Sequence, residues 1–206
     1  VCLRSRRRPS RQCASPVQLH GVAVVVGARP PDPHARERQI VISATAWMPA
    51  YIALGSNLDE PRGQVENGFV RIARIAQTRL IARSRLYASA PLGAVAQPNF
   101  VNAVAGVLTK LAPRELLTEL KELERALGRE QPIVRWGPRR IDFDLLVYAD
   151  IRVNETDLVV PHVGIPQRNF VLYPLRDIAP ELVIPGFGVV RELAQRVGAG
   201  GLHVLP

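Results

Sequence analysis

The sequence predicts an α+β domain with a ferredoxin-like βαββαβ core, in which two helices pack on one face of an antiparallel sheet. Several short segments are apolar or alternate with a period of two, which is typical of strands. In two other segments the apolar residues recur every three or four positions, which is typical of amphipathic helices. These segments follow one another as strand, helix, strand, strand, helix and strand, which is the order of the split βαβ arrangement.

The first half of the predicted core runs from residue 50 to residue 89. Ala50–Leu54 is a short apolar run that stops at Gly55-Ser56-Asn57, as expected of a buried strand that enters a turn. The helix that follows is marked by apolar residues at helical spacing, namely Val65, Phe69, Ile72, Ala73 and Ala76. A strand-like stretch over about Leu80–Ser89 completes the first strand, helix and strand.

The second half contains the clearest helix of the chain. Phe100–Leu108 is predicted to be a strand, because its side chains alternate between two faces. Pro113 begins and Gly128 ends a helix whose leucines recur at helical spacing, namely Leu116, Leu117, Leu120, Leu123 and Leu127. Ile141–Tyr148 is the fourth strand. Residues 149–206 are expected to add short strands, turns and a helix near Val189–Val197.

Composition and charge divide the chain near residue 47. The chain has 206 residues and two cysteines, Cys2 and Cys13, which excludes a Cys-based zinc site or a cysteine nucleophile in the rest of the chain. Much of the net charge of +9 lies in residues 1–47, which are rich in Arg, Ser and Pro and are poor material for a core. Because Met48 directly precedes the first strand, we expect residues 1–47 to be a disordered or dispensable extension, with a targeting segment as the alternative. Residues 48–206 would then form the functional domain.

The residues that suggest chemistry concentrate between positions 129 and 144. Asp142 and Asp144 alternate with apolar neighbours, so both carboxylates are expected on one side of a strand. Carboxylates without His or Cys ligands suit Mg²⁺, which takes its other ligands from water and substrate phosphates. Upstream lie Arg129, Arg135 and Arg139, and guanidinium groups beside an acid pair are what phosphoryl transfer requires. This pattern favours a phosphoryl-transfer site, although a solvated acidic face or salt bridges to these arginines would give the same pattern.

Other readings of the sequence find less support. The chain has neither a Gly-x-x-x-x-Gly-Lys-Ser/Thr loop nor a Gly-x-Gly-x-x-Gly motif, which excludes P-loop, dinucleotide-binding and protein-kinase folds. The alternative function is a ferredoxin-like RNA-binding module with an Arg-rich tail. Such a module would need exposed aromatic residues on a central strand, and Val101–Leu108 offers none.

A series of short motifs follows in one order across residues 50–185. They are Tyr51-Ile52-Ala53-Leu54-Gly55-Ser56-Asn57, Pro91-Leu92-Gly93, Phe100-Val101-Asn102, Gly128-Arg129, Arg135-Trp136-Gly137-Pro138-Arg139, Ile141-Asp142-Phe143-Asp144, Val160-Pro161-His162, Arg168-Asn169-Phe170-Val171-Leu172 and Pro174-Leu175. Together they resemble the 6-hydroxymethyl-7,8-dihydropterin pyrophosphokinase family. The resemblance implies transfer of diphosphate from ATP to the pterin hydroxymethyl oxygen, with Mg²⁺ and with release of AMP, in folate biosynthesis.

The resemblance also implies roles for individual residues. Asp142 and Asp144 would bind two Mg²⁺ ions and take part in catalysis. Arg129 and Arg139 would be the catalytic arginines that bind phosphate. The residues implied in ATP binding are Glu124, Arg135, Trp136, His162 and Arg168, and those implied in pterin binding are Ser89, Leu92, Phe100, Asn102 and Phe170. ATP and the pterin would be the partners, without nucleic acid or membrane, and we expect a cytoplasmic monomer.

Overall fold

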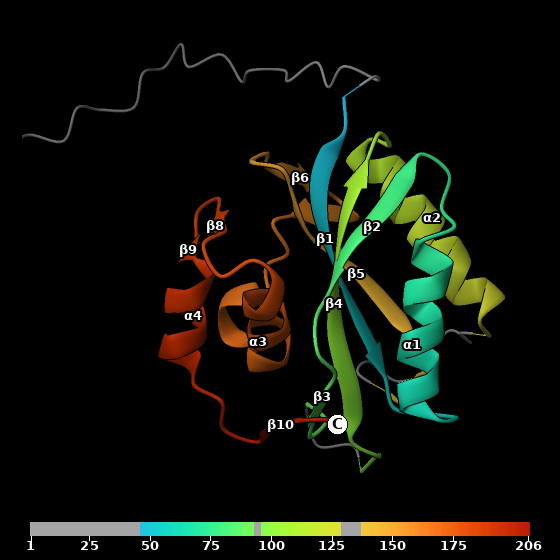
Figure 1. Ribbon diagram of the computed structural model, residues 1–206, viewed down its shortest axis with the longest axis vertical. Coiled ribbons are helices and arrows are strands. Elements are labelled where there is room, and N and C mark those ends of the chain that lie inside the picture. Colours follow the sequence, from blue (N-terminus) through green and yellow to red (C-terminus); the bar gives the residue numbers. More distant parts are fainter. Residues whose placement is uncertain (1–45, 93–95, 129–136) are drawn as a thin grey trace, which may run out of the picture. The chain divides into compact units, whose positions relative to one another are not determined.

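The computed structural model describes residues 46–92, 96–128 and 137–206 (Figure 1). The elements of the predicted core are β1 (Met48–Ser56), α1 (Pro61–Ile72), β2 (Thr78–Arg83), β3 (Tyr87–Ser89), β4 (Phe100–Thr109), α2 (Pro113–Ala126) and β5 (Asp142–Tyr148). After them come β6 (Val153–Glu155), β7 (Leu158–Val160), a 3-10 turn (Ile165–Gln167), α3 (Asn169–Ile178), β8 (Val183–Ile184), β9 (Gly188–Val189), α4 (Val190–Val197) and β10 (Leu202–Val204). The chain is therefore α+β, as predicted.

The strand pairing confirms the split βαβ order. The main sheet has the order β10-β3-β4-β1-β5, and β2 also pairs with β4. All of these pairs are antiparallel. The predicted second strand is in two pieces, because β2 and β3 both pair with β4 but are separated by residues 84–86. The predicted first, third and fourth strands are present as β1, β4 and β5.

Different helices cover the two faces of this sheet, with α1 and α2 on one face and α3 and α4 on the other (Figure 1). On the first face, Leu54 of β1 and Phe143 of β5 are fully buried against α1 and α2. On the second face, Val104 of β4 and Leu146 of β5 are buried against α3 and α4. Because both faces are covered, the central strands of the described chain offer no open sheet surface of the kind that the alternative RNA-binding function requires.

Helix α3 was not predicted from the sequence, whereas the two predicted core helices, α1 and α2, pack on one face as expected. Pro174 lies inside α3, and a proline lacks the N–H of a helical hydrogen bond, which is why the sequence did not indicate a helix there. Val171, Leu172 and Leu175 are nevertheless buried in the core, and this packing stabilises the helix. The predicted helix near Val189–Val197 is confirmed as α4, whereas α1 ends earlier than expected, at Ile72.

The ends of α2 agree with the sequence prediction. The helix begins at Pro113, and the side chain of Glu115 accepts a hydrogen bond from the Ala112 N–H at 2.7 Å. Beyond its last turn, Gly128 adopts a φ of +80°, a conformation that favours glycine. In the described ranges, no helix has the length and apolar character needed to cross a membrane.

Candidate active site

A cavity of about 320 Å³ opens on the second face of the sheet, at the end where α3 begins. Its walls come from β1, β3, β4, β5, the start of α3 and the segments beside them. Most of the predicted site residues line it, namely Ser89, Leu92, Phe100, Asn102, Arg139, Asp142, Asp144, His162, Arg168 and Phe170. The fold thus brings together residues that lie more than 80 positions apart in the sequence.

Both predicted carboxylates, Asp142 and Asp144, face this cavity from β5. Phe143 between them points to the opposite face, where it is fully buried, so the predicted alternation is present. Burial, followed by the negative charge of Asp142, raises the pKa of Asp144. The two carboxylates therefore repel each other in a poorly solvated place, which favours a cation between them.

Two basic side chains approach Asp142. Arg139 forms an ion pair with Asp142, and the Lys121 Nζ lies 3.9 Å from the Asp142 Oδ1. The Nε of Arg139 is buried and has no hydrogen-bond partner in the described part of the chain. A buried donor of this kind is costly unless a ligand satisfies it, so an anionic group in the cavity would complete its hydrogen bonding.

Asn57 holds the backbone of Arg139, a role that the sequence analysis missed. Its Oδ1 accepts a hydrogen bond from the Arg139 N–H at 2.8 Å, and its own N–H donates to the Arg139 carbonyl at 3.1 Å. The Asn57 Nδ2 also donates to the Pro98 carbonyl at 3.2 Å. The available signal was a polar residue in a Gly-Ser-Asn turn directly after a buried strand.

Lys121 and Glu124 share one hydrogen-bond network on α2. Glu124 is buried and does not line the cavity; it accepts a 2.7 Å hydrogen bond from the Phe143 N–H and pairs with Lys121 at 2.8 Å. Burial raises the pKa of Glu124. Lys121 lines the cavity, although the sequence analysis did not select it. Its signal was its place three residues before Glu124 on the same helix.

The opposite wall of the cavity carries the residues predicted to bind the pterin. The Asn102 Nδ2 donates to the Ser89 Oγ at 3.0 Å and to the Tyr87 carbonyl at 3.4 Å. Phe100 and Phe170 line the cavity from β4 and α3, and each ring has a guanidinium group near it. An amide edge between two aromatic rings suits a flat heterocycle with donors and acceptors along its edge.

Gly55 of β1 lies between the two walls. It is paired with Asn102 on one side and with Asp142 on the other. Because neighbouring strands lie about 4.8 Å apart, the amide wall and the acid pair are separated by about 10 Å across the cavity floor. A β-carbon at Gly55 would lie 3.5 Å from the Asn102 Oδ1.

A backbone hydrogen bond and burial both favour the neutral form of the His162 ring. The Gly164 N–H donates to the His162 Nδ1 at 3.0 Å, so the ring proton is on Nε2. Burial lowers the pKa of the His162 imidazole, which favours the neutral ring.

Among the other predicted residues, Arg129, Arg135 and Trp136 lie outside the described residues.

The acid pair fits a magnesium site, although the described residues contain no group of three or more His, Cys, Asp or Glu side chains that could hold a metal ion by themselves. Asp142 and Asp144 offer only carboxylate oxygens, which Mg²⁺ prefers. Mg²⁺ commonly uses one or two carboxylates and takes its other ligands from water and phosphate. Two carboxylates facing a cavity with cationic walls are therefore sufficient for such an ion.

The chain is similar to proteins of one family over most of its described length. The profile of the 7,8-dihydro-6-hydroxymethylpterin-pyrophosphokinase family matches residues 51–180. The 2-amino-4-hydroxy-6-hydroxymethyldihydropteridine pyrophosphokinase of Pseudomonas aeruginosa is 44% identical over 156 residues, which cover 76% of this chain and 96% of the relative. The protein of the same name from Haemophilus influenzae is 41% identical over 147 residues, which cover 71% of this chain and 91% of the relative.

Solved structures give the same fold. A crystal structure of HPPK-DHPS in complex with substrates aligns with a TM-score of 0.60 at 14% identity, covering 74% of this chain and 43% of that chain. Plasmodium falciparum HPPK-DHPS A437G with pteroate aligns with a TM-score of 0.57 at 15% identity, covering 77% of this chain and 45% of that chain. These likenesses show the fold. The family match over residues 51–180 and the 44% identity to the Pseudomonas aeruginosa relative show that the chain belongs to the 7,8-dihydro-6-hydroxymethylpterin-pyrophosphokinase family.

Proposed function

We propose that the chain transfers the terminal diphosphate of ATP to the hydroxymethyl oxygen of 6-hydroxymethyl-7,8-dihydropterin, with Mg²⁺, and releases AMP. The observation that carries this proposal is the arrangement across Gly55, where an amide wall and an acid pair face each other over one strand. A heterocycle on the amide side and a polyphosphate on the acid side would meet above this glycine. Their reacting atoms would then be held close together, which accounts for much of the rate in phosphoryl transfer.

The pterin is assigned to the wall that contains Asn102. The Asn102 amide and the Ser89 hydroxyl present donors and acceptors to the edge of the ring. Phe100 and Phe170 would stack on its faces, and Leu92 would cover it from the adjoining loop. Such a slot selects a flat heterocycle by shape and orients its hydroxymethyl group.

The ATP phosphates are assigned to the cationic side of the cavity. Arg139 supplies a buried Nε without a partner in the described chain, and His162 supplies an Nε2 proton. Arg168 and Lys121 line the same cavity and add positive charge. Guanidinium groups bind phosphate oxygens in pairs, so Arg139 and Arg168 would orient the chain of phosphates as well as neutralise it.

Asp142 and Asp144 would hold the two Mg²⁺ ions that we propose for this site. When bound, these ions would neutralise phosphate charge and act as Lewis acids toward the transferred group. Arg139 forms an ion pair with Asp142, so its guanidinium group lies beside the carboxylates that would hold the ions.

In the proposed reaction one phosphorus–oxygen bond forms and another breaks. The pterin hydroxymethyl oxygen forms a bond to the β-phosphorus of ATP. The bond from this phosphorus to the oxygen shared with the α-phosphate breaks, AMP leaves with that electron pair, and the hydroxyl proton passes to solvent. Arg139 and His162 would donate hydrogen bonds to the oxygens that gain charge.

The products provide the test. The purified chain should convert ATP and the hydroxymethylpterin into equal amounts of AMP and pterin diphosphate, as measured by chromatography with phosphorus NMR. Formation of ADP would mean that attack occurs at the terminal phosphorus, and it would overturn the proposal.

The same assay tests the proposed domain boundary, because a chain that starts at Met48 should keep full activity. If this shorter chain folds but loses most of its activity, residues 1–47 belong to the site.

A further inference from the structure

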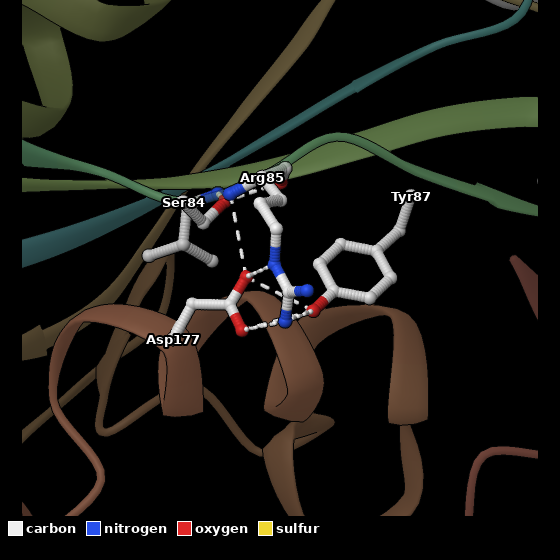
Figure 2. Close-up of polar contacts among 5 residues, drawn as sticks. Ser84, Arg85, Tyr87 and Asp177 are labelled. Carbon is white, nitrogen blue, oxygen red and sulfur yellow. Dashed lines mark hydrogen bonds and ion pairs between the residues drawn. The ribbon is translucent and has the colours of Figure 1, made fainter. Parts of the chain in front are cut away.

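A polar cluster joins the linker between β2 and β3 to the end of α3 (Figure 2). Asp177 accepts hydrogen bonds from the Arg85 N–H, Nε and Nη2 at 3.3, 3.1 and 2.7 Å. The Tyr87 hydroxyl donates to the same carboxylate at 2.9 Å, and the Arg85 Nη2 donates to this hydroxyl at 3.0 Å. The three side chains form a closed set of hydrogen bonds, which we call the α3 clamp (Arg85, Tyr87 and Asp177).

Two of the three members of the clamp are enclosed. Tyr87 is 2% exposed and the Asp177 side chain is 11% exposed, whereas the Arg85 side chain is 59% exposed. Burial raises the pKa of Tyr87, so its hydroxyl remains protonated and can donate to Asp177. Hydrogen bonds to a charged and enclosed partner are stronger than those between neutral exposed groups.

The linker that carries Arg85 is itself held in place. The Ser84 N–H donates to the Val104 carbonyl at 3.0 Å, and the Val104 N–H donates to the Ser84 Oγ at 2.9 Å. Ser84 therefore anchors the break between β2 and β3 to the central strand β4. This break, which divides the predicted second strand, lets Arg85 reach α3 (Figure 2).

Tyr87 connects the clamp to one wall of the cavity. It pairs with Asn102 in the β3–β4 register, and its carbonyl accepts a 3.4 Å hydrogen bond from the Asn102 Nδ2. Asp177 connects the clamp to the other wall, since it lies on the helix whose first turn carries Phe170. Neither Tyr87 nor Asp177 lines the cavity. The clamp thus links the amide wall to the aromatic residue on α3 without contact with the cavity.

The first residue of α3, Asn169, is bonded to the segment that leads into β10, the strand that pairs with β3. The Asn169 Nδ2 donates to the Gly200 carbonyl at 2.9 Å, and Leu202, two residues further on, pairs with Ser89 of β3. Figure 1 shows β10 beside β3 at this end of the sheet. Hydrogen bonds therefore connect the two ends of α3 to the residues beside β3 and to the segment that leads into β10.

We propose that Tyr87 and Asp177 are positioning residues for the pterin, because the α3 clamp sets the spacing of the slot between Asn102 and Phe170. This inference rests on the proposed function. It goes beyond that function because it assigns a role in substrate affinity to residues outside the cavity. A stacking slot loses affinity when its walls separate, whereas the acid pair on β5 would keep its place, as would Arg139 and Lys121 beside it. Of the groups assigned to the phosphates, Arg168 is the one at the start of α3.

The test compares Tyr87→Phe with the parent. The substitution removes one hydroxyl and keeps the ring, so the core should remain packed. We expect the KM for the pterin to rise about tenfold, the KM for ATP to change less than about twofold, and kcat to fall only slightly. Fluorescence titration of the pterin in the presence of a non-hydrolysable ATP analogue should show the same loss of affinity.

The matched control is Glu181→Gln, which removes an exposed ion pair with Arg191 in the same helical layer. This pair makes no contact with β3, so both KM values should stay as in the parent. A lower melting temperature of Tyr87→Phe with both KM values unchanged would show a merely structural role and would overturn the inference. An equal rise in both KM values would overturn it as well.

Two further outcomes distinguish a failure of the proposed function from a failure of this inference. If the parent forms no AMP, the proposed function fails, whatever the variants do. If Tyr87→Phe does not fold, Arg85→Ala replaces it, because the exposed Arg85 can be removed while the Tyr87 and Asp177 bond remains. This variant should raise the KM for the pterin by about two- to threefold. An unchanged value in an active Arg85→Ala variant would then overturn the inference.

Discussion

The two faces of the central sheet use the same strands but are covered in different ways. On the first face, α1 and α2 cover the sheet with a continuous apolar layer that includes Phe143. On the second face, α3 and α4 bury an apolar layer around Val104, and beyond its edge lies the cavity. Asp142 and Asp144 project to this second face from either side of Phe143. One strand therefore serves stability on one face and chemistry on the other.

This difference gives each face its own measurable property. Substitutions on the first face should lower the free energy of unfolding, because they remove packed apolar surface. Substitutions of the cavity residues should change catalysis or affinity, because these groups are held for a ligand. The substitutions predicted below concern residues that lie close together but on opposite faces.

The largest effect is expected for Asp144→Asn. Because burial and the charge of Asp142 disfavour the charged form of Asp144, its neutral replacement should melt no lower than the parent without metal. The activation barrier should rise on the order of 5 kcal/mol, because a carboxylate that we propose as a Mg²⁺ ligand loses its charge. Calorimetry without metal and turnover against Mg²⁺ concentration measure the two properties. A destabilised variant with normal Mg²⁺-dependent turnover would contradict the assignment of Asp144 as a Mg²⁺ ligand.

A substitution of Asp142 changes both the proposed metal site and an ion pair. Its Ala variant should lose activity to a similar degree, but Arg139 would also lose its partner in the metal-free state. We therefore expect a small fall in the melting temperature of Asp142→Ala besides the loss of rate. Comparison with Asp144→Asn then separates the contribution of this ion pair from that of the metal.

The second prediction concerns Phe143→Ala, on the opposite face of the same strand. Phe143 is fully buried, so the free energy of unfolding should fall by about 3 to 4 kcal/mol. Turnover per folded molecule at low temperature should fall less than about tenfold, because the carboxylates remain. Urea unfolding and kinetics on the same sample measure both quantities. An unchanged stability with complete loss of activity would contradict the division between the faces.

The sequence predicted the first face well and the second face in part. Periods of two and of 3.6 are local signals, and they placed β1, β4, β5 and α2 close to their observed bounds. The alternation around Phe143 also placed both carboxylates on one side. Pro174 concealed α3, because the rule that proline ends a helix is local and the packing that overrides it is not.

The parts of the site that the sequence analysis missed depend on contacts between distant segments. Lys121 enters the site because α2 packs beside β5, and Asn57 because its turn meets the backbone of Arg139. The clamp joins Tyr87 to Asp177, 90 positions apart. No spacing within one element predicts such pairs. The ordered family motifs include most of the cavity residues and Asn57, but not Lys121, Tyr87 or Asp177.

The third prediction is Gly68→Ala, on the first face. Gly68 lies in α1, where a β-carbon would come within 2.8 Å of the Leu54 Cδ2 and 3.2 Å of the Phe143 Cε1. The overpacking should cost about 1 to 3 kcal/mol, and the better helix propensity of alanine offsets about 1 kcal/mol of this. A fall of a few degrees in the melting temperature with normal KM values is expected. Altered substrate affinity would show that the two faces are coupled.

The smallest effect is expected for Gly55→Ala, which places the same methyl group on the second face. Here the nearest atom is the Asn102 Oδ1 at an ordinary 3.5 Å, so the core is not overpacked. Alanine is also favoured over glycine within a strand by about 0.5 to 1 kcal/mol, so the melting temperature should stay equal or rise slightly. The methyl group would instead occupy the cavity floor between Asn102 and Asp142. The KM values should therefore rise a few-fold while stability is kept, which is the reverse of the result for Gly68→Ala. Steady-state kinetics and melting of the two variants in parallel provide the measurement, and equal behaviour of the two alanines would mean that the faces do not divide stability from binding.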